Sequence, residues 1–121
     1  MYEIIFYEDA HGNSPVDELI SKLDQKAEKN NKDARIQLKQ IMYQIDVLEN
    51  VGTRCSSEYV KYIRNDIWEL RPGDNRILLF GWKNNKIVLL HSFRKTTNET
   101  PRRQIERAER EIQDWVSRHG K

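Results

Sequence analysis

The sequence has few of the features that mark exported, membrane or redox proteins. Its single cysteine, Cys55, can form no internal disulfide, and there is no CxxC pair for a metal or redox site. The start carries no basic leader, and the longest aliphatic runs, 77–80 and 87–90, are far too short to cross a bilayer. We therefore expect a soluble cytoplasmic protein without a membrane partner.

Familiar catalytic and cofactor motifs are missing as well. The sequence contains no HExxH, no Gly-rich phosphate loop, no GxSxG and no paired His and Cys spacing. His11 and His119 lie near an expected loop and a chain end, without ligand spacing around them. We expect neither metal nor cofactor, and conventional hydrolase chemistry is disfavoured.

What the sequence does contain fits one compact domain over residues 1–121. With 37% hydrophobic and 33% charged residues, such a chain should bury roughly two-thirds of its unfolded surface. Its charges are unevenly distributed: residues 1–53 carry six Lys/Arg against ten Asp/Glu, whereas residues 54–95 carry nine against four. This polarity favours a basic face for a polyanion.

The first half of the chain predicts a strand and two helices. Residues 2–8 mix aromatic and β-branched side chains, which favours a strand. Ser14 as N-cap and Pro15 as the first helical residue then predict a helix. A second helix should follow the Asn-rich break at 30–33 and end at Gly52.

The second half predicts an antiparallel meander and a final helix. From Lys61 onward the hydrophobic period changes to two, and turn residues separate the expected strands. Thr100 as cap and Pro101 as first residue predict the last helix. The predicted fold class is α+β, with an N-terminal strand and a helical hairpin packed on an antiparallel sheet and a C-terminal helix.

Basic residues and a histidine should meet in the second half. A tight turn at Asn84-Asn85 pairs its two flanking strands around that centre. The register then places Arg76, His91 and Lys95 on one side of the sheet, while Arg94 points to the other side unless the strand bends. Cations can hold a phosphate, and an imidazole can exchange a proton near neutral pH, so this group suits RNA cleavage by the neighbouring 2′-hydroxyl.

Simpler interpretations stand beside this one. His91 could be a hydrogen-bonded core histidine. Arg71 and Arg76 could pair with nearby acidic residues, which is the favoured interpretation for Arg71, and Arg94-Lys95 could be a solvated strand end. The aromatic residues in the strands are predicted to be core rather than stacking platforms.

An ordered set of segments carries a family resemblance. The segments 68–71, 75–80 and 89–97, followed by Pro101 and the helix that contains Ala108, resemble the RelE/ParE superfamily, and most closely the phage-derived HigB toxins. The order of elements agrees over nearly the whole chain. The resemblance implies a RelE-like fold.

The resemblance also implies roles for individual residues. Arg76 resembles the arginine that contacts the scissile phosphate, and Lys95 resembles the basic group that stabilises the transition state. RelE has a catalytic tyrosine near its C-terminus, whereas no tyrosine follows Thr97 in this sequence. The resemblance therefore implies that His91 transfers the proton, as histidines do in some HigB proteins. RelE has lysines where this chain has Ile67 and Glu69. The RNA-binding residues predicted around this centre are Lys61, Arg71 and Arg94.

The function implied by the resemblance is that of a type II toxin: a metal-independent, ribosome-dependent mRNA endoribonuclease that inhibits translation. Its partners would be mRNA, the ribosome and a cognate antitoxin with a helix-turn-helix domain, through which the complex binds operator DNA. One alternative is a ParE-like inhibitor of DNA gyrase without ribonuclease activity. Another is a degenerate relative that acts only as a binding partner.

Overall fold

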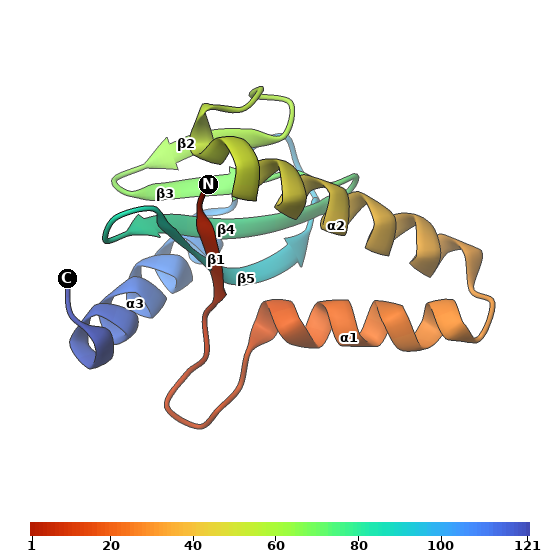
Figure 1. Ribbon diagram of the computed structural model, residues 1–121, viewed down its shortest axis with the longest axis horizontal. Coiled ribbons are helices and arrows are strands. Elements are labelled where there is room, and N and C mark those ends of the chain that lie inside the picture. The colour runs from red at the N-terminus through yellow and green to blue at the C-terminus, as the bar shows by residue number, and fades with distance from the viewer.

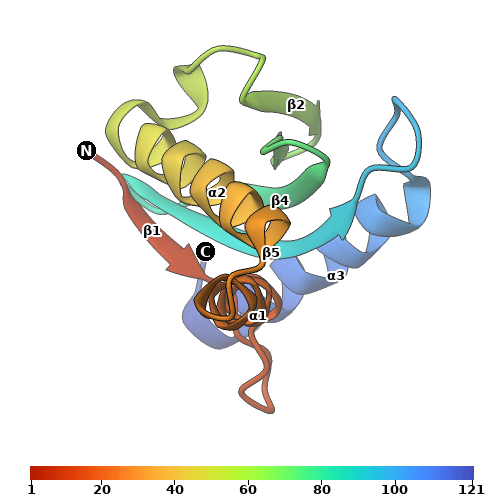
Figure 2. The ribbon, with the colours of Figure 1, turned by 90° about the vertical axis from the view of Figure 1, so that its right-hand side faces the viewer.

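A computed structural model describes all residues 1–121 and contains a five-stranded sheet with helices on both faces (Figures 1 and 2). In chain order the elements are β1 (Glu3–Phe6), α1 (Pro15–Glu28), α2 (Lys32–Val51), a short 3-10 helix (Gly52–Arg54), β2 (Val60–Arg64), β3 (Ile67–Leu70), β4 (Asn75–Trp82), β5 (Lys86–Arg94) and α3 (Arg102–His119). The strand order in the sheet is β1-β5-β4-β3-β2. The α+β class and the element order are therefore confirmed.

The sheet is mixed rather than antiparallel throughout. Strands β2 to β5 form the expected antiparallel meander, but β1 pairs in parallel with β5, with Ile4 opposite Ile87 and Phe6 opposite Leu89. Parallel neighbours need a long connection, and here two helices and three strands separate them in sequence. The predicted antiparallel sheet is confirmed for β2 to β5, and the N-terminal strand extends it in parallel at one edge.

Each face of the sheet carries its own hydrophobic core. On the face of the helical hairpin, the strand residues Leu70, Ile77, Leu79, Ile87 and Leu89 pack with buried residues of α1 and α2 such as Leu23, Ile41 and Leu48. On the opposite face, Ile67, Leu78, Phe80, Val88 and Leu90 pack with Ile105, Ala108 and Trp115 of α3. Residues on the two faces alternate along each strand, which is why the central strands are nearly continuous hydrophobic runs.

The β4–β5 hairpin has a longer turn than predicted and corrects its register with a bulge. Trp82 pairs with Lys86 across a loop of residues 83–85, in which Lys83 and Asn85 have positive φ. The pairing is shifted by one residue near this loop, and an irregularity between Leu78 and Leu79 restores the predicted register. Beyond the bulge, Leu78 lies opposite His91 and Arg76 opposite Phe93, so Arg76 and His91 are on the same side of the sheet, as predicted.

The two residues predicted as helix caps, Ser14 and Thr100, form other hydrogen bonds instead. Ser14 precedes α1, but its hydroxyl donates to the carbonyl of Tyr7 at 2.8 Å instead of capping the helix. The hydroxyl of Thr100 likewise donates to Glu69 at 2.6 Å, and Pro101 takes the N-cap position of α3. Both side chains tie loops to the sheet. Helix α1 therefore begins at Pro15 as predicted but without the predicted cap bond, whereas α3 begins at Arg102, one residue later than predicted.

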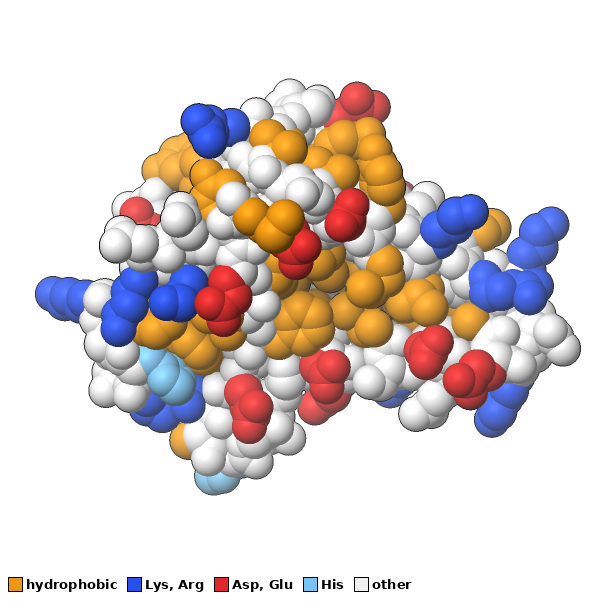
Figure 3. All heavy atoms as spheres, in the orientation of Figure 1, with side chains coloured by type: hydrophobic (Ala, Val, Ile, Leu, Met, Phe, Trp, Pro, Cys, Tyr) orange, Lys and Arg blue, Asp and Glu red, His pale blue; other side chains and the backbone are white.

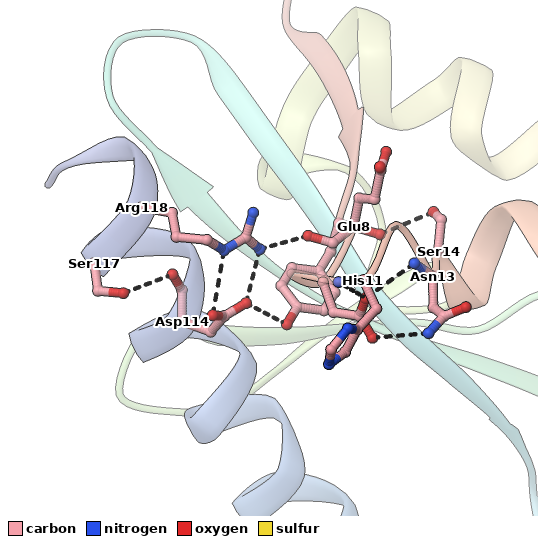
Figure 4. A network of polar contacts seen from close by, with 9 residues as sticks. Glu8, His11, Asn13, Ser14, Asp114, Ser117 and Arg118 are labelled. Atoms are coloured by element: carbon pink, nitrogen blue, oxygen red, sulfur yellow. Dashed lines mark hydrogen bonds and ion pairs between the residues drawn. The ribbon is translucent and has the colours of Figure 1, made fainter.

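A polar network fastens the end of α3 to the segment that follows β1 (Figure 4). The hydroxyl of Tyr7 donates to Asp114 Oδ2 at 2.6 Å, and Arg118 bonds the same carboxylate at 2.7 Å. Arg118 also donates to the carbonyl of Glu8. Burial and the Asp114 carboxylate raise the pKa of Tyr7 well above its usual value of 10.0. None of the three helices is long and apolar enough to span a membrane.

Candidate functional site

Polar residues gather where β4 begins, β5 ends and the chain continues into α3. A narrow cleft at this corner is lined by Glu69, Arg76, Phe93, Lys95 and residues 96–101. It leads into an open groove of about 670 Å³ that shares part of the 96–101 segment. In Figure 2 this segment is the blue loop that projects beyond the sheet before α3.

A buried carboxylate lies at the floor of the cleft. Glu69 on β3 is only 3% exposed, and its Oε1 lies 3.7 Å from Arg71 Nε and 3.9 Å from Arg76 Nε. Its other oxygen accepts the hydrogen bond of Thr100. A buried carboxylate needs such partners, because burying an unpaired charge is costly. Glu69 therefore holds two guanidinium groups and the 96–101 segment around one point.

Arg76 is a fixed cation in the wall of the cleft. It is 7% exposed, and its Nη1 donates to the carbonyls of Gly73 and Asn75, both at 2.8 Å. Burial and the positive charge of Arg71 lower the pKa of Arg76, while Glu69 opposes that shift. Guanidinium remains charged in proteins, so the group presents a preorganised positive charge to the cleft.

Neighbouring residues Arg94 and Lys95 point to opposite sides of the sheet. Lys95 is exposed and lines the cleft, and its backbone N–H donates to the carbonyl of Asp74 at 2.8 Å. Arg94 instead bonds Gln37 of α2 at 3.1 Å and lies 3.9 Å from the Asp74 carboxylate. The predicted side of Arg94 is confirmed, so Arg76 and Lys95 share the cleft without it.

His91 lies on the same face as Arg76 but is enclosed beneath α3. It has no exposed surface; its Nδ1 lies 2.5 Å from Glu111 Oε1 and its Nε2 lies 2.9 Å from Gln104 Oε1. Arg107 bonds the second oxygen of Glu111 at 3.2 Å. The geometry matches the interpretation of His91 as a hydrogen-bonded core residue. It gives no support to direct proton exchange with a substrate, because the ring does not reach the cleft surface.

The remaining predicted residues flank the cleft. Arg71 pairs with Glu69 as predicted, with its side chain 26% exposed. Lys61 on β2 lies opposite Glu69 in the sheet and is exposed. Two of the predicted RNA-binding residues are thus beside the cleft, and the third, Arg94, is on the other face.

Two features of the site were missed in the sequence. A charged side chain such as Glu69 is normally expected at the surface, yet alternation along the strand places Glu69 on the same side as the buried Ile67. The 96–101 segment had no hydrophobic period, and its contribution to the cleft arises from the Thr100 bond to Glu69. No group of three or more His, Cys, Asp or Glu side chains lies close enough together to hold a metal ion.

The site lies in the part of the chain that matches the model of a known protein family. The model of the family described as Phage derived protein Gp49-like (DUF891) matches residues 19–113. This span begins within α1, contains strands β2 to β5 and ends within α3, so it includes every residue that lines the cleft. None of the curated proteins matches the chain.

Proposed function

Because the chain belongs to the Gp49-like family of phage-derived proteins, a family of RelE/HigB-like toxins, we propose that it is the toxin of a type II toxin–antitoxin system. We further propose that it is a metal-independent, ribosome-dependent mRNA endoribonuclease. The observation that carries this proposal is the presence of Arg76 and Lys95 in one cleft, with Arg76 held by Glu69 and by two backbone carbonyls.

The proposed chemistry uses the RNA's own nucleophile. The 2′-hydroxyl gives its proton to water as it attacks the adjacent phosphorus, the bond to the 5′-oxygen of the next nucleotide breaks, and that oxygen takes a proton from water. The products carry a 2′,3′-cyclic phosphate and a 5′-hydroxyl. Negative charge increases on the phosphate oxygens during this step. Arg76 and Lys95 stabilise it, and the ribosome supplies the mRNA in a suitable conformation.

His91 acts in this proposal as a positioning residue. Its bonds to Gln104 and Glu111 hold the first half of α3 against the sheet. The 96–101 segment, which lines the cleft, leads directly into that half of the helix. His91 thereby fixes the wall of the cleft opposite Arg76 without touching the RNA.

Translation with purified ribosomes tests the proposal. The wild-type protein should cleave translated mRNA, and Lys95→Ala should lower kcat by about 10²–10³, the usual cost of removing one group that stabilises the transition-state charge. Lys95 is exposed, so this variant should fold normally. Arg94→Ala is the matched control, because it removes the adjacent cation from the opposite face.

Arg76→Ala should lose cleavage as well. Because Arg76 also bonds the carbonyls of Gly73 and Asn75, its thermal unfolding is measured in parallel. Intact mRNA at doses of wild-type protein that stop growth would contradict the nuclease proposal. Inhibited DNA supercoiling with undamaged mRNA would select the gyrase-directed alternative.

The proposed partner is an antitoxin with a helix-turn-helix domain. Ile36, Met42 and Tyr43 of α2 are about half exposed, at 48%, 46% and 56%. Figure 3 shows hydrophobic side chains gathered between α1 and α2 on the face that it draws. Co-expression with the product of an adjacent small gene should restore growth, and the purified complex should bind operator DNA; growth arrest despite co-expression would count against this partner.

A further inference from the structure

The open groove beside the cleft carries an arginine cluster that the proposed catalytic step does not use. Arg64 of β2 and Arg102 and Arg103 of α3 line it, together with threonines of the 96–101 segment. Glu99 is the only acidic residue in the lining. The groove is therefore a basic surface, separate from Arg76 and Lys95.

These arginines are held only loosely by protein partners. Arg64 lies 3.3 Å from Glu109, with its side chain 46% exposed, and Arg102 lies 3.9 Å from Glu106, with its side chain 83% exposed. Arg103 is exposed and forms no ion pair. Exposed pairs contribute about 0–1 kcal/mol, so an incoming phosphate can replace them at little cost.

The groove continues the path of the cleft. Thr96, Thr97, Glu99, Thr100 and Pro101 line both. A chain whose scissile phosphate lies between Arg76 and Lys95 would therefore extend directly into the groove. This continuity favours a polymer of phosphates over a separate small ligand.

The lining also indicates which part of a nucleotide it suits. Ile105 is its only hydrophobic residue, and no aromatic side chain is present on which a base could stack. Arginine guanidinium groups and threonine hydroxyls bind phosphate and ribose oxygens. We propose that this groove is a sugar–phosphate subsite, in which Arg64, Arg102 and Arg103 hold the RNA backbone next to the scissile bond without selecting its sequence.

The subsite rests on the proposed function, and its test is a salt titration of RNA binding. The probes are labelled 2′-O-methyl oligoadenosine and oligouridine of equal length, which lack the attacking hydroxyl. Each phosphate contact on a single strand contributes about 0.7 to the slope of log K against log salt. The triple variant Arg64→Ala, Arg102→Ala, Arg103→Ala should lower that slope by about 2 and weaken both probes equally.

Arg35→Ala is the control, since Arg35 is an exposed arginine of α2 on the other side of the sheet. It should leave the slope unchanged. In ribosome-dependent cleavage, the triple variant should raise KM and keep kcat, because the subsite binds ground state and transition state alike.

Several results would overturn the inference. The subsite is refuted if the triple variant has the same slope of log K against log salt as the wild-type protein. It is also refuted if the wild-type protein binds neither probe. If the triple variant lost affinity for one probe more than for the other, the groove would contact the bases and select sequence. Arginine-dependent binding of a poly-glutamate peptide with an unchanged RNA slope would assign the groove to an acidic protein segment.

The two proposals fail separately. Cleavage of mRNA by the wild-type protein together with an unchanged slope removes the subsite alone. Intact mRNA together with the expected slope removes the nuclease and leaves an RNA-binding groove.

Discussion

Replacing His91 with alanine should destabilise the protein strongly, while Arg76 and Lys95, to which His91 is not hydrogen-bonded, stay in the cleft. The substitution removes a bond of 2.5 Å to Glu111 and one of 2.9 Å to Gln104. A bond to a charged group contributes about 1.5–3 kcal/mol and a neutral one about 1 kcal/mol. Arg107 still pairs with Glu111, which limits the cost of the remaining charge.

Together these losses are about 2.5–4 kcal/mol, out of a total of about 5–15 kcal/mol for a domain. The midpoint of thermal unfolding should fall by about 10–15 °C, since 1 kcal/mol corresponds to several degrees in a chain of this size. Circular dichroism against temperature and a urea titration measure both quantities. A double-mutant cycle with Glu111→Gln should give a coupling energy of about 2 kcal/mol.

His11→Ala is the matched control, because His11 is exposed in the loop before α1 and should change stability by less than about 0.5 kcal/mol. Below its unfolding transition, His91→Ala should still cleave mRNA, with kcat reduced far less than in Lys95→Ala. An unchanged stability would refute the positioning role. A full loss of cleavage in a stably folded His91→Ala protein would return the proton-transfer role to this histidine.

Two further predictions concern the fold. Tyr7→Phe removes the bond to Asp114 and should cost about 1–2 kcal/mol near neutral pH. Because the pKa of Tyr7 is raised in the folded state, the folded protein retains a proton that the unfolded chain releases, so the free energy of unfolding of the wild-type protein should fall above about pH 10. The variant Tyr7→Phe should flatten this decline. An equally steep decline for Tyr7→Phe in urea titrations would contradict the assignment. On α2, Ile41→Ala should lower the free energy of unfolding by about 2–5 kcal/mol, because Ile41 is fully buried. Ile36→Ala should change it by less than about 0.5 kcal/mol, because Ile36 is 48% exposed. Equal losses for the two variants in denaturant titrations would contradict the packing described.

The element order and the face of most strand residues could be predicted from the sequence, because hydrophobic period and turn residues act locally. The change to a period of two after Lys61 predicted the meander, and alternation predicted that Arg94 would turn away from Arg76. The parallel partner of β1 could not be predicted in this way. Edge pairing depends on which strand has a free edge after the helices have packed.

The sequence by itself therefore determined the α+β order and the nearness of Arg76 to Lys95. The tertiary structure alone decided that His91 is enclosed, since α3, more than ten residues further along the chain, brings Gln104 and Glu111 over it. It also decided that Glu69 is buried and that Thr100 bonds it. Burial and long-range polar contacts depend on how separate elements pack, and local periodicity carries no information about those partners.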